Sequence, residues 1–157
     1  MNKAVVSRLF DEVYNRGDLD ALDELHSPDF VGDDPRPTPG IAAYKETQAS
    51  VRAQYERYFR AFAWELTDVA AEGALTFVRM TFRGQQISDD KPDVTMQGFF
   101  EASLAEGKIV RVWSLVDVAS LTAQLSAYSA ATSPFTLRMS LDNKGQAISD
   151  EALFRCV

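Results

Sequence analysis

A single carboxylate, Asp117, lies inside an otherwise apolar run near the carboxyl end of the chain. Leu115, Val116, Val118 and Leu121 surround it in the sequence. A charge in apolar surroundings costs several kcal/mol unless it is paired or neutralised. Two interpretations are therefore open. Asp117 caps the start of a following helix, or it lies at the bottom of a pocket with a raised pKa and transfers protons.

The alternation of side chains along strands decides which residues would share a pocket with Asp117. If Asp117 points inward, so do Leu115, Trp113 and Arg111, while Val112, Ser114 and Val116 face outward. The preceding strand allows two choices: either Gln97, Phe99, Glu101 and Ser103 face inward, or Phe100, Ala102 and Leu104 do. The first choice brings Glu101 near Asp117, and two close carboxylates push their pKa values apart, leaving one as acid and one as base.

Further candidates lie earlier in the chain. Asp33 and Asp34 are neighbours in a stretch rich in turn formers, 29–39, which could form a pocket rim. The only histidine, His26, lies at a predicted helix end, where it more often contacts the last carbonyls than acts as a catalyst. The predicted substrate-binding residues are Trp113, Tyr44, Tyr55, Tyr58, Phe99, Leu115 and Arg79.

The elements that must position these residues can be read from hydrophobic periodicity. Spacings of three and four predict helices over 3–16, from Asp18 to Pro28, and from Pro39 to about Phe62. Alternation predicts strands over 63–71, 74–84, 94–104 and 109–118. The strand at 74–84 has bulky residues at both parities, which indicates that both of its sides are covered. Helices followed by antiparallel strands predict an α+β fold, and a bent sheet folded over a helix leaves a hollow suited to a small molecule.

Composition narrows the class of protein. The chain has 157 residues, a net charge of -7, one cysteine and one histidine. No basic run is present, which argues against nucleic acid or an anionic membrane as a partner, and a Cys/His zinc site within one chain is excluded. The early charge in the N-terminal stretch argues against a signal peptide, and no apolar run approaches a membrane span. We therefore expect a cytoplasmic protein.

The last 32 residues differ in character from the rest. A small, polar stretch is followed by FTLRMSL, which alternates like a half-buried strand. We expect a domain over 1–125 and an extension over 126–157 whose strand packs on the sheet or on a partner subunit, because an exposed apolar edge invites aggregation.

Several stretches together resemble the SnoaL-like polyketide cyclases of the NTF2-like superfamily. These are FDEVYNRGDLDALDEL (10–25), Pro28 to Phe30, Pro35 with Gly40, and Gly107-Lys108-Ile109 followed by Trp113, Asp117 and Gln124-Leu125. The resemblance implies a cone-shaped α+β barrel, in which a curved antiparallel sheet wraps the helices around a deep pocket. It also implies a homodimer built through the sheet. It implies an acid/base role for Asp117 in a cofactor-free and metal-free reaction: a carbon next to a carbonyl is deprotonated and the enolate closes a ring.

One departure from the family pattern concerns histidine. Cyclases of this branch also use a pocket histidine, and no predicted strand contains one; where many relatives have His-Asp-Pro, this chain has Asp33-Asp34-Pro35. The partner of Asp117 is then of another type, with Glu101, Asp34 and Tyr44 as candidates. Two alternative functions remain: an epoxide hydrolase or epoxide-opening cyclase with paired acids, and a non-catalytic protein that binds a small molecule.

Overall fold

The computed structural model describes residues 2–33 and 37–127. Within them the helices are α1 (Asn2–Arg8), η1 (Leu9–Asn15, a π-helix), α2 (Ala21–Leu25), α3 (Ile41–Tyr58) and α4 (Val118–Ala127). The strands are β1 (His26–Asp33), β2 (Pro37–Pro39), β3 (Phe59–Glu72), β4 (Leu75–Gln86), β5 (Val94–Ala105) and β6 (Lys108–Val116). The α+β class is therefore confirmed, whereas the predicted extension over 126–157 lies almost entirely outside the described residues.

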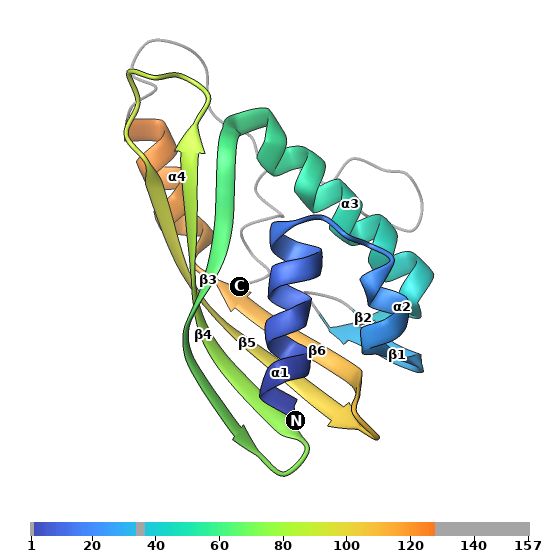
Figure 1. The fold of residues 1–157 in the computed structure, drawn as a ribbon. Coiled ribbons are helices and arrows are strands. Elements are labelled where there is room, and N and C mark those ends of the chain that lie inside the picture. The colour runs from blue at the N-terminus through green and yellow to red at the C-terminus, as the bar shows by residue number, and fades with distance from the viewer. Residues whose placement is uncertain (1, 34–36, 128–157) are drawn as a thin grey trace.

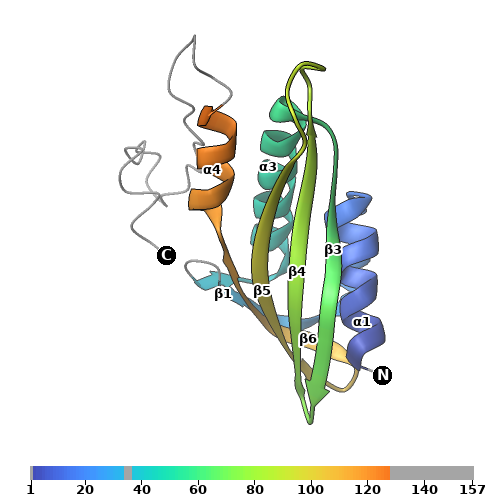
Figure 2. The same ribbon diagram turned by 90° about the vertical axis from the view of Figure 1, so that its left-hand side faces the viewer.

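The strands form one curved, open sheet in the order β2-β1-β6-β5-β4-β3 (Figure 1). Neighbouring strands are antiparallel except β1 and β6, which are parallel. The two views place α1 and α3 on the same side of this sheet (Figure 2). The sheet thus has one face that the helices cover, called the inner face below, and an opposite outer face.

Two predicted elements were wrong in detail. The stretch 29–39, predicted as a loop, contains most of β1 and all of β2. Its main pairing is with β6, about 80 residues away in the chain, so no local pattern reveals it. The third helix ends at Tyr58 rather than near Phe62, because Phe59 is already extended and opens β3, which pairs along β4.

The inner face carries two hydrophobic clusters. The larger one packs side chains of α1 and η1 against β4, β5 and β6, with Phe10 edge-on to Phe100 at a centroid distance of 5.2 Å. The smaller one lies where α4 covers the sheet and joins Phe59, Phe82, Val94, Met96, Leu121 and Leu125. Burial of these apolar side chains is the main favourable term in folding.

Candidate functional site

Asp117 lies between β6 and α4 and caps the helix. Its carboxylate Oδ1 accepts a hydrogen bond of 2.9 Å from the Ser120 backbone N–H, and its own carbonyl accepts one from Leu121. The side chain is exposed. Of the two interpretations of Asp117, the structure shows the helix cap, and the buried pocket was wrong, because the chain turns from strand to helix at this residue and the carboxylate accepts from an N–H of the first turn.

The parity of β6 that an inward Asp117 would require is not found, and on β5 one of the two choices left open is. On β6 the inward residues are Val112, Ser114 and Val116, whereas Trp113 and Leu115 lie on the outer face. On β5 the second choice holds: Phe100, Ala102 and Leu104 are buried, and Phe99 is 56% exposed. The predicted substrate-binding residues Trp113, Leu115, Phe99 and Arg79 therefore belong to the outer face, where Arg79 pairs with Asp68 at 2.6 Å.

The two acids proposed to cooperate are not brought together. Glu101 lies on the outer face between Phe77 and Trp113 of the neighbouring strands. The Asp117 N–H instead bonds the carbonyl of Gln97, four positions away from Glu101 along β5, which corresponds to about 13 Å. Asp34 lies outside the described residues. The observation that would have favoured a paired-acid mechanism at Asp117 and Glu101 is thus missing.

The three candidate tyrosines of α3 have separate surroundings. Tyr44 is buried in the larger cluster, and its hydroxyl is 2.7 Å from the hydroxyl of Tyr14 on η1. Tyr55 packs against Phe82 and Phe62 with tilted rings and lines a cleft described below. Tyr58 packs on the smaller cluster. Of the three, Tyr55 alone is among the residues that line the cleft, and Tyr44 reaches it through its contact with Tyr14.

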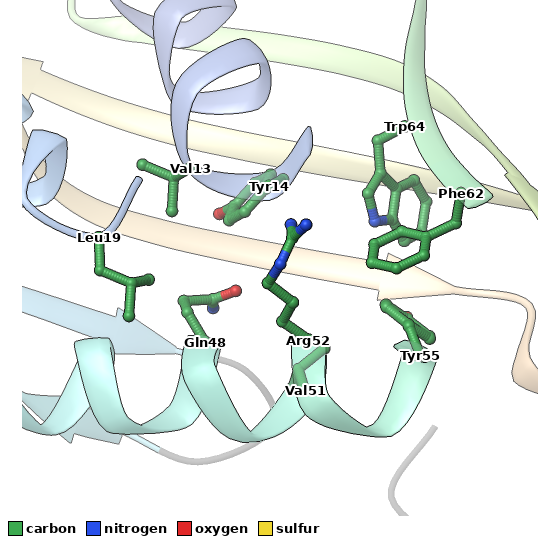
Figure 3. A pocket seen from close by; sticks show the side chains of 9 residues that line it. All are labelled: Val13, Tyr14, Leu19, Gln48, Val51, Arg52, Tyr55, Phe62 and Trp64. Atoms are coloured by element: carbon green, nitrogen blue, oxygen red, sulfur yellow. The ribbon is translucent and has the colours of Figure 1, made fainter. Parts of the chain in front are cut away.

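The cleft opens between η1, α3 and the start of β3 (Figure 3). It has about 320 Å³ of empty space, the part open to solvent included. Nine residues line it: Val13, Tyr14, Leu19, Gln48, Val51, Arg52, Tyr55, Phe62 and Trp64. None of the nine is an acid or a histidine, so the cleft is mainly apolar and aromatic, with Tyr14, Gln48 and Arg52 as its polar groups.

Arg52 is the one cation among these lining residues, and several contacts hold it. Its Nε forms an ion pair with Glu56 at 3.0 Å, its Nη1 donates to the Asn15 carbonyl at 3.2 Å, and its guanidinium lies over the Phe62 ring. A Cβ atom at Gly17 would lie 2.7 Å from Nε, so the absence of a side chain there makes room for the arginine. Gly17 has φ of 78°, a conformation that glycine adopts without strain.

Asn15 ties the end of η1 to β3 at the cleft. Its side chain accepts a hydrogen bond of 2.7 Å from the Trp64 N–H and donates one of 3.0 Å to the Trp64 carbonyl. Within the described sheet, β3 is an edge strand that pairs with β4 on one side, so these two bonds satisfy the Trp64 backbone groups on its open side. Because the Asn15 carbonyl also receives Arg52, one residue links η1, β3 and α3 around the cleft.

His26 is buried in the core and not in the cleft. Its Nδ1 donates a 3.0 Å hydrogen bond to the Leu22 carbonyl, and the ring packs edge-on against Phe30. Burial lowers the pKa of His26 to about 4, so the imidazole is neutral near pH 7. The prediction that His26 contacts the last carbonyls of its helix is confirmed.

Sequence reasoning missed Tyr14, Gln48 and Arg52 as lining residues. From the sequence, only Gln48 and Arg52 could have been grouped, because they are four positions apart on α3 and that spacing places them on one face of the helix. Their meeting with Tyr14 depends on tertiary contacts. Within residues 2–33 and 37–127, no group of three or more His, Cys, Asp or Glu residues is placed to hold a metal ion, and no helix is long and apolar enough to cross a membrane.

Comparison with known proteins identifies the family. The model of the SnoaL-like domain matches residues 6–112, about two thirds of the chain. The chain therefore belongs to the SnoaL-like family, within the NTF2-like superfamily, as its sequence predicted. No curated protein matches the sequence.

Solved structures share the fold at low sequence identity. IdmH of Streptomyces antibioticus, a candidate polyketide cyclase, is 20% identical with a TM-score of 0.68 over 80% of this chain and 99% of that one. A candidate SnoaL-like cyclase of Jannaschia is 21% identical, with a TM-score of 0.65 over 80% and 92%. A protein of Catenulispora acidiphila with a ketosteroid isomerase-like fold is 12% identical, with a TM-score of 0.66 over 85% and 100%. At these identities the likeness establishes the fold alone.

Proposed function

We propose that this protein is a cofactor-independent cyclase or isomerase that acts on a polyketide-like or related small molecule bound in the cleft. The observation that carries the proposal is the pair of hydroxyls of Tyr14 and Tyr44, 2.7 Å apart and partly buried beside an aromatic-walled hollow. A tyrosine hydroxyl both donates and accepts hydrogen bonds, and it is a type of group that enzymes use to stabilise negative charge on a substrate oxygen. The names of the similar structures support the reaction class.

The chemistry that fits this pair is stabilisation of an enolate. Removal of a proton next to a carbonyl places negative charge on the carbonyl oxygen, and a fixed O–H donor in a site shielded from water stabilises that charge. Loss of one such donor typically lowers the rate about 100-fold. The tyrosine pair thus acts as the electrophilic part of the site, and the base is a separate group.

Two carboxylates, Asp34 and Asp117, remain candidates for the base that removes the proton, and we do not favour them equally. Asp34 lies outside the described residues, two positions beyond Gly32 in the sequence. Asp117 already binds a backbone N–H as a helix cap. We therefore favour Asp34, and expect Asp34→Asn to abolish turnover and Asp117→Asn to preserve it.

The proposal is tested by incubating dialysed protein with a simple aryl ketone, tetralone, in D2O. NMR then measures the rate at which the α-protons of the ketone are replaced by deuterium. We expect exchange above the buffer rate, and a loss of about 100-fold in Tyr14→Phe or Tyr44→Phe. Tyr58→Phe, on the same helix as Tyr44 but outside the cleft, is the matched control and should keep the wild-type rate. Exchange no faster than buffer, or equal rates in all the tyrosine variants, would refute the enolate mechanism.

A non-catalytic binding role is the second candidate, and one observation favours it. The Asp117 carboxylate, one of those predicted to be catalytic, is occupied at the start of α4, and the residues lining the described cleft include no acid. In that case ligands bind in the cleft without any exchange of their α-protons. The same NMR experiment separates the two functions, because binding shifts the ligand signals whether or not deuterium is incorporated.

For the assembly, we propose a homodimer formed through the outer face of the sheet. Six large apolar residues are exposed there: Val31, Leu75, Phe77, Phe99, Trp113 and Leu115. Register places them in adjacent rows, with Phe77, Glu101 and Trp113 side by side across three strands. A contiguous apolar patch on a sheet is typical of a subunit interface.

The dimer is tested by sedimentation of the full chain. Trp113→Lys places a charge in the middle of the apolar rows and should shift the protein towards monomer. Ile87→Lys is the matched control, because Ile87 is 56% exposed but lies in the loop after β4. A wild-type protein that sediments as a monomer at micromolar concentration would refute this assembly.

A further inference from the structure

Arg52 has more hydrogen-bond donors than the fold uses. A guanidinium carries five N–H groups. Within the described residues, Nε forms an ion pair with Glu56 and one N–H of Nη1 donates to the Asn15 carbonyl. No described residue accepts from Nη2. The structural needs of Asn15 and Glu56 are therefore met while three donors, in the plane of the group, remain for another partner.

The free donors lie inside the cleft. Figure 3 shows Arg52 rising from α3 so that its guanidinium ends between Tyr14 on one side and Phe62 and Trp64 on the other. The side chain is about two thirds buried, at 32% exposure. A charged donor in such surroundings forms stronger hydrogen bonds than one in water, because the local dielectric constant is lower.

The position of Arg52 is fixed before any ligand arrives. Gly17 leaves room beneath it, the Phe62 ring lies against its face at 5.3 Å, and Asn15 anchors its Nη1 to a segment that is itself tied to β3. A held guanidinium loses little side-chain entropy on binding and presents a planar fork that matches a carboxylate. A purely structural arginine would not need to point its remaining donors into an apolar hollow.

We propose that the cleft selects an organic acid, a ligand with a flat apolar body and a carboxylate that pairs with Arg52. This inference rests on the cleft being the ligand site of the proposed function, and it adds the chemical class of the ligand. The aromatic walls, Tyr14, Tyr55, Phe62 and Trp64, take the flat body. The net charge of -7 disfavours anions at the rest of the surface, so the local cation determines where an acid binds.

The test compares naphthoate with its uncharged analogue naphthamide on the wild-type protein at pH 7, by calorimetry. Chemical shifts of the Trp64 indole N–H locate binding at the cleft. We expect naphthoate to bind at least about 10-fold more tightly, as for a charge-assisted hydrogen bond. Arg52→Gln should remove this preference. Arg57→Gln, which removes the same charge from an exposed position of the same helix, should keep it.

Three results would overturn the proposal, and they differ in what else they affect. Equal binding of both probes to the wild type leaves the cleft as the ligand site but removes the selection for an acid. A preference that persists in Arg52→Gln places the anion elsewhere. Absence of binding by either probe refutes both the acid selection and the cleft as the ligand site. The wild-type comparison needs no variant, so a folding defect in Arg52→Gln cannot obscure it.

Discussion

Phe99 and Phe100 are adjacent on β5 and face opposite sides of the same sheet. Phe100 is 3% exposed and packs edge-on against Phe10, whereas Phe99 is 56% exposed beside Leu115. The same contrast separates Val112 from Trp113 on β6. Each face carries large apolar side chains, yet among the described residues one face is covered by helices and the other is not. A single large apolar residue on a strand therefore does not by itself show which side becomes the core.

The largest expected effect on the free energy of unfolding comes from truncating a phenylalanine to alanine on each face of the sheet. Phe100→Ala should lower the free energy of unfolding by about 3–5 kcal/mol, because it removes a buried ring and leaves a cavity. Phe99→Ala should change it by no more than about 0.5 kcal/mol in the monomer, and should weaken association instead. Urea denaturation at two protein concentrations measures both, since only a dimer has a concentration-dependent midpoint. Equal losses would mean that the faces do not differ as the structure describes.

His26 allows the covered side to be tested by pH. Burial lowers its pKa from 6.5 to about 4, so between these values the unfolded chain binds a proton that the folded protein excludes. The contribution of His26 to the free energy of unfolding is therefore fully present above about pH 6.5. It is lost as the pH drops towards about 4, and the loss is about 3 kcal/mol in total.

Carboxylates titrate in the same range, so a variant isolates the histidine. His26→Asn removes the only histidine while offering an amide N–H near the Leu22 carbonyl. Chemical denaturation across pH 4 to 8 should show a smaller acid loss in the variant. Identical profiles for the two proteins would mean that His26 does not contribute.

A smaller effect concerns Thr76, a polar residue on the inner face of β4. It is fully buried, and its hydroxyl has no hydrogen-bond partner among the described residues. Thr76→Val replaces the hydroxyl with a methyl group of similar size and should raise stability by about 1 kcal/mol. Thr95→Val, at an exposed position of β5, should change thermal unfolding little. A destabilised Thr76→Val would indicate that the hydroxyl has a partner.

The smallest effect is at Asp117, which lies at the end of β6. Asp117→Ala should cost about 1 kcal/mol through loss of the cap on α4, whereas Asp117→Asn should cost only a few tenths, because asparagine caps equally well. Thermal unfolding of both variants measures the difference. Equal losses in the two variants would indicate that the charge, and not the capping bond, is what α4 needs.

The prediction of the fold succeeded where local pattern is decisive. Most strands and helices and the helical contact of His26 follow from periodicity and from residues a few positions apart. The family follows from motifs within residues 10–25 and 107–125. The candidate site was predicted far less well. Tyr55 lines the cleft and Tyr44 contacts the lining residue Tyr14, whereas Trp113, Leu115, Phe99 and Arg79 lie on the opposite face of the sheet.

The sequence by itself determined the α+β class, the strand alternation and the family, because these depend on short-range spacing and composition. Tertiary structure alone decided which parity faces the helices, that β1 lies beside β6, and that Asp117 caps α4. It also decided the cleft, where Arg52 meets Asn15, 37 residues away, and Asn15 meets Trp64, 49 residues away. Contacts of such sequence separation are set by how whole elements pack, and no local preference encodes them.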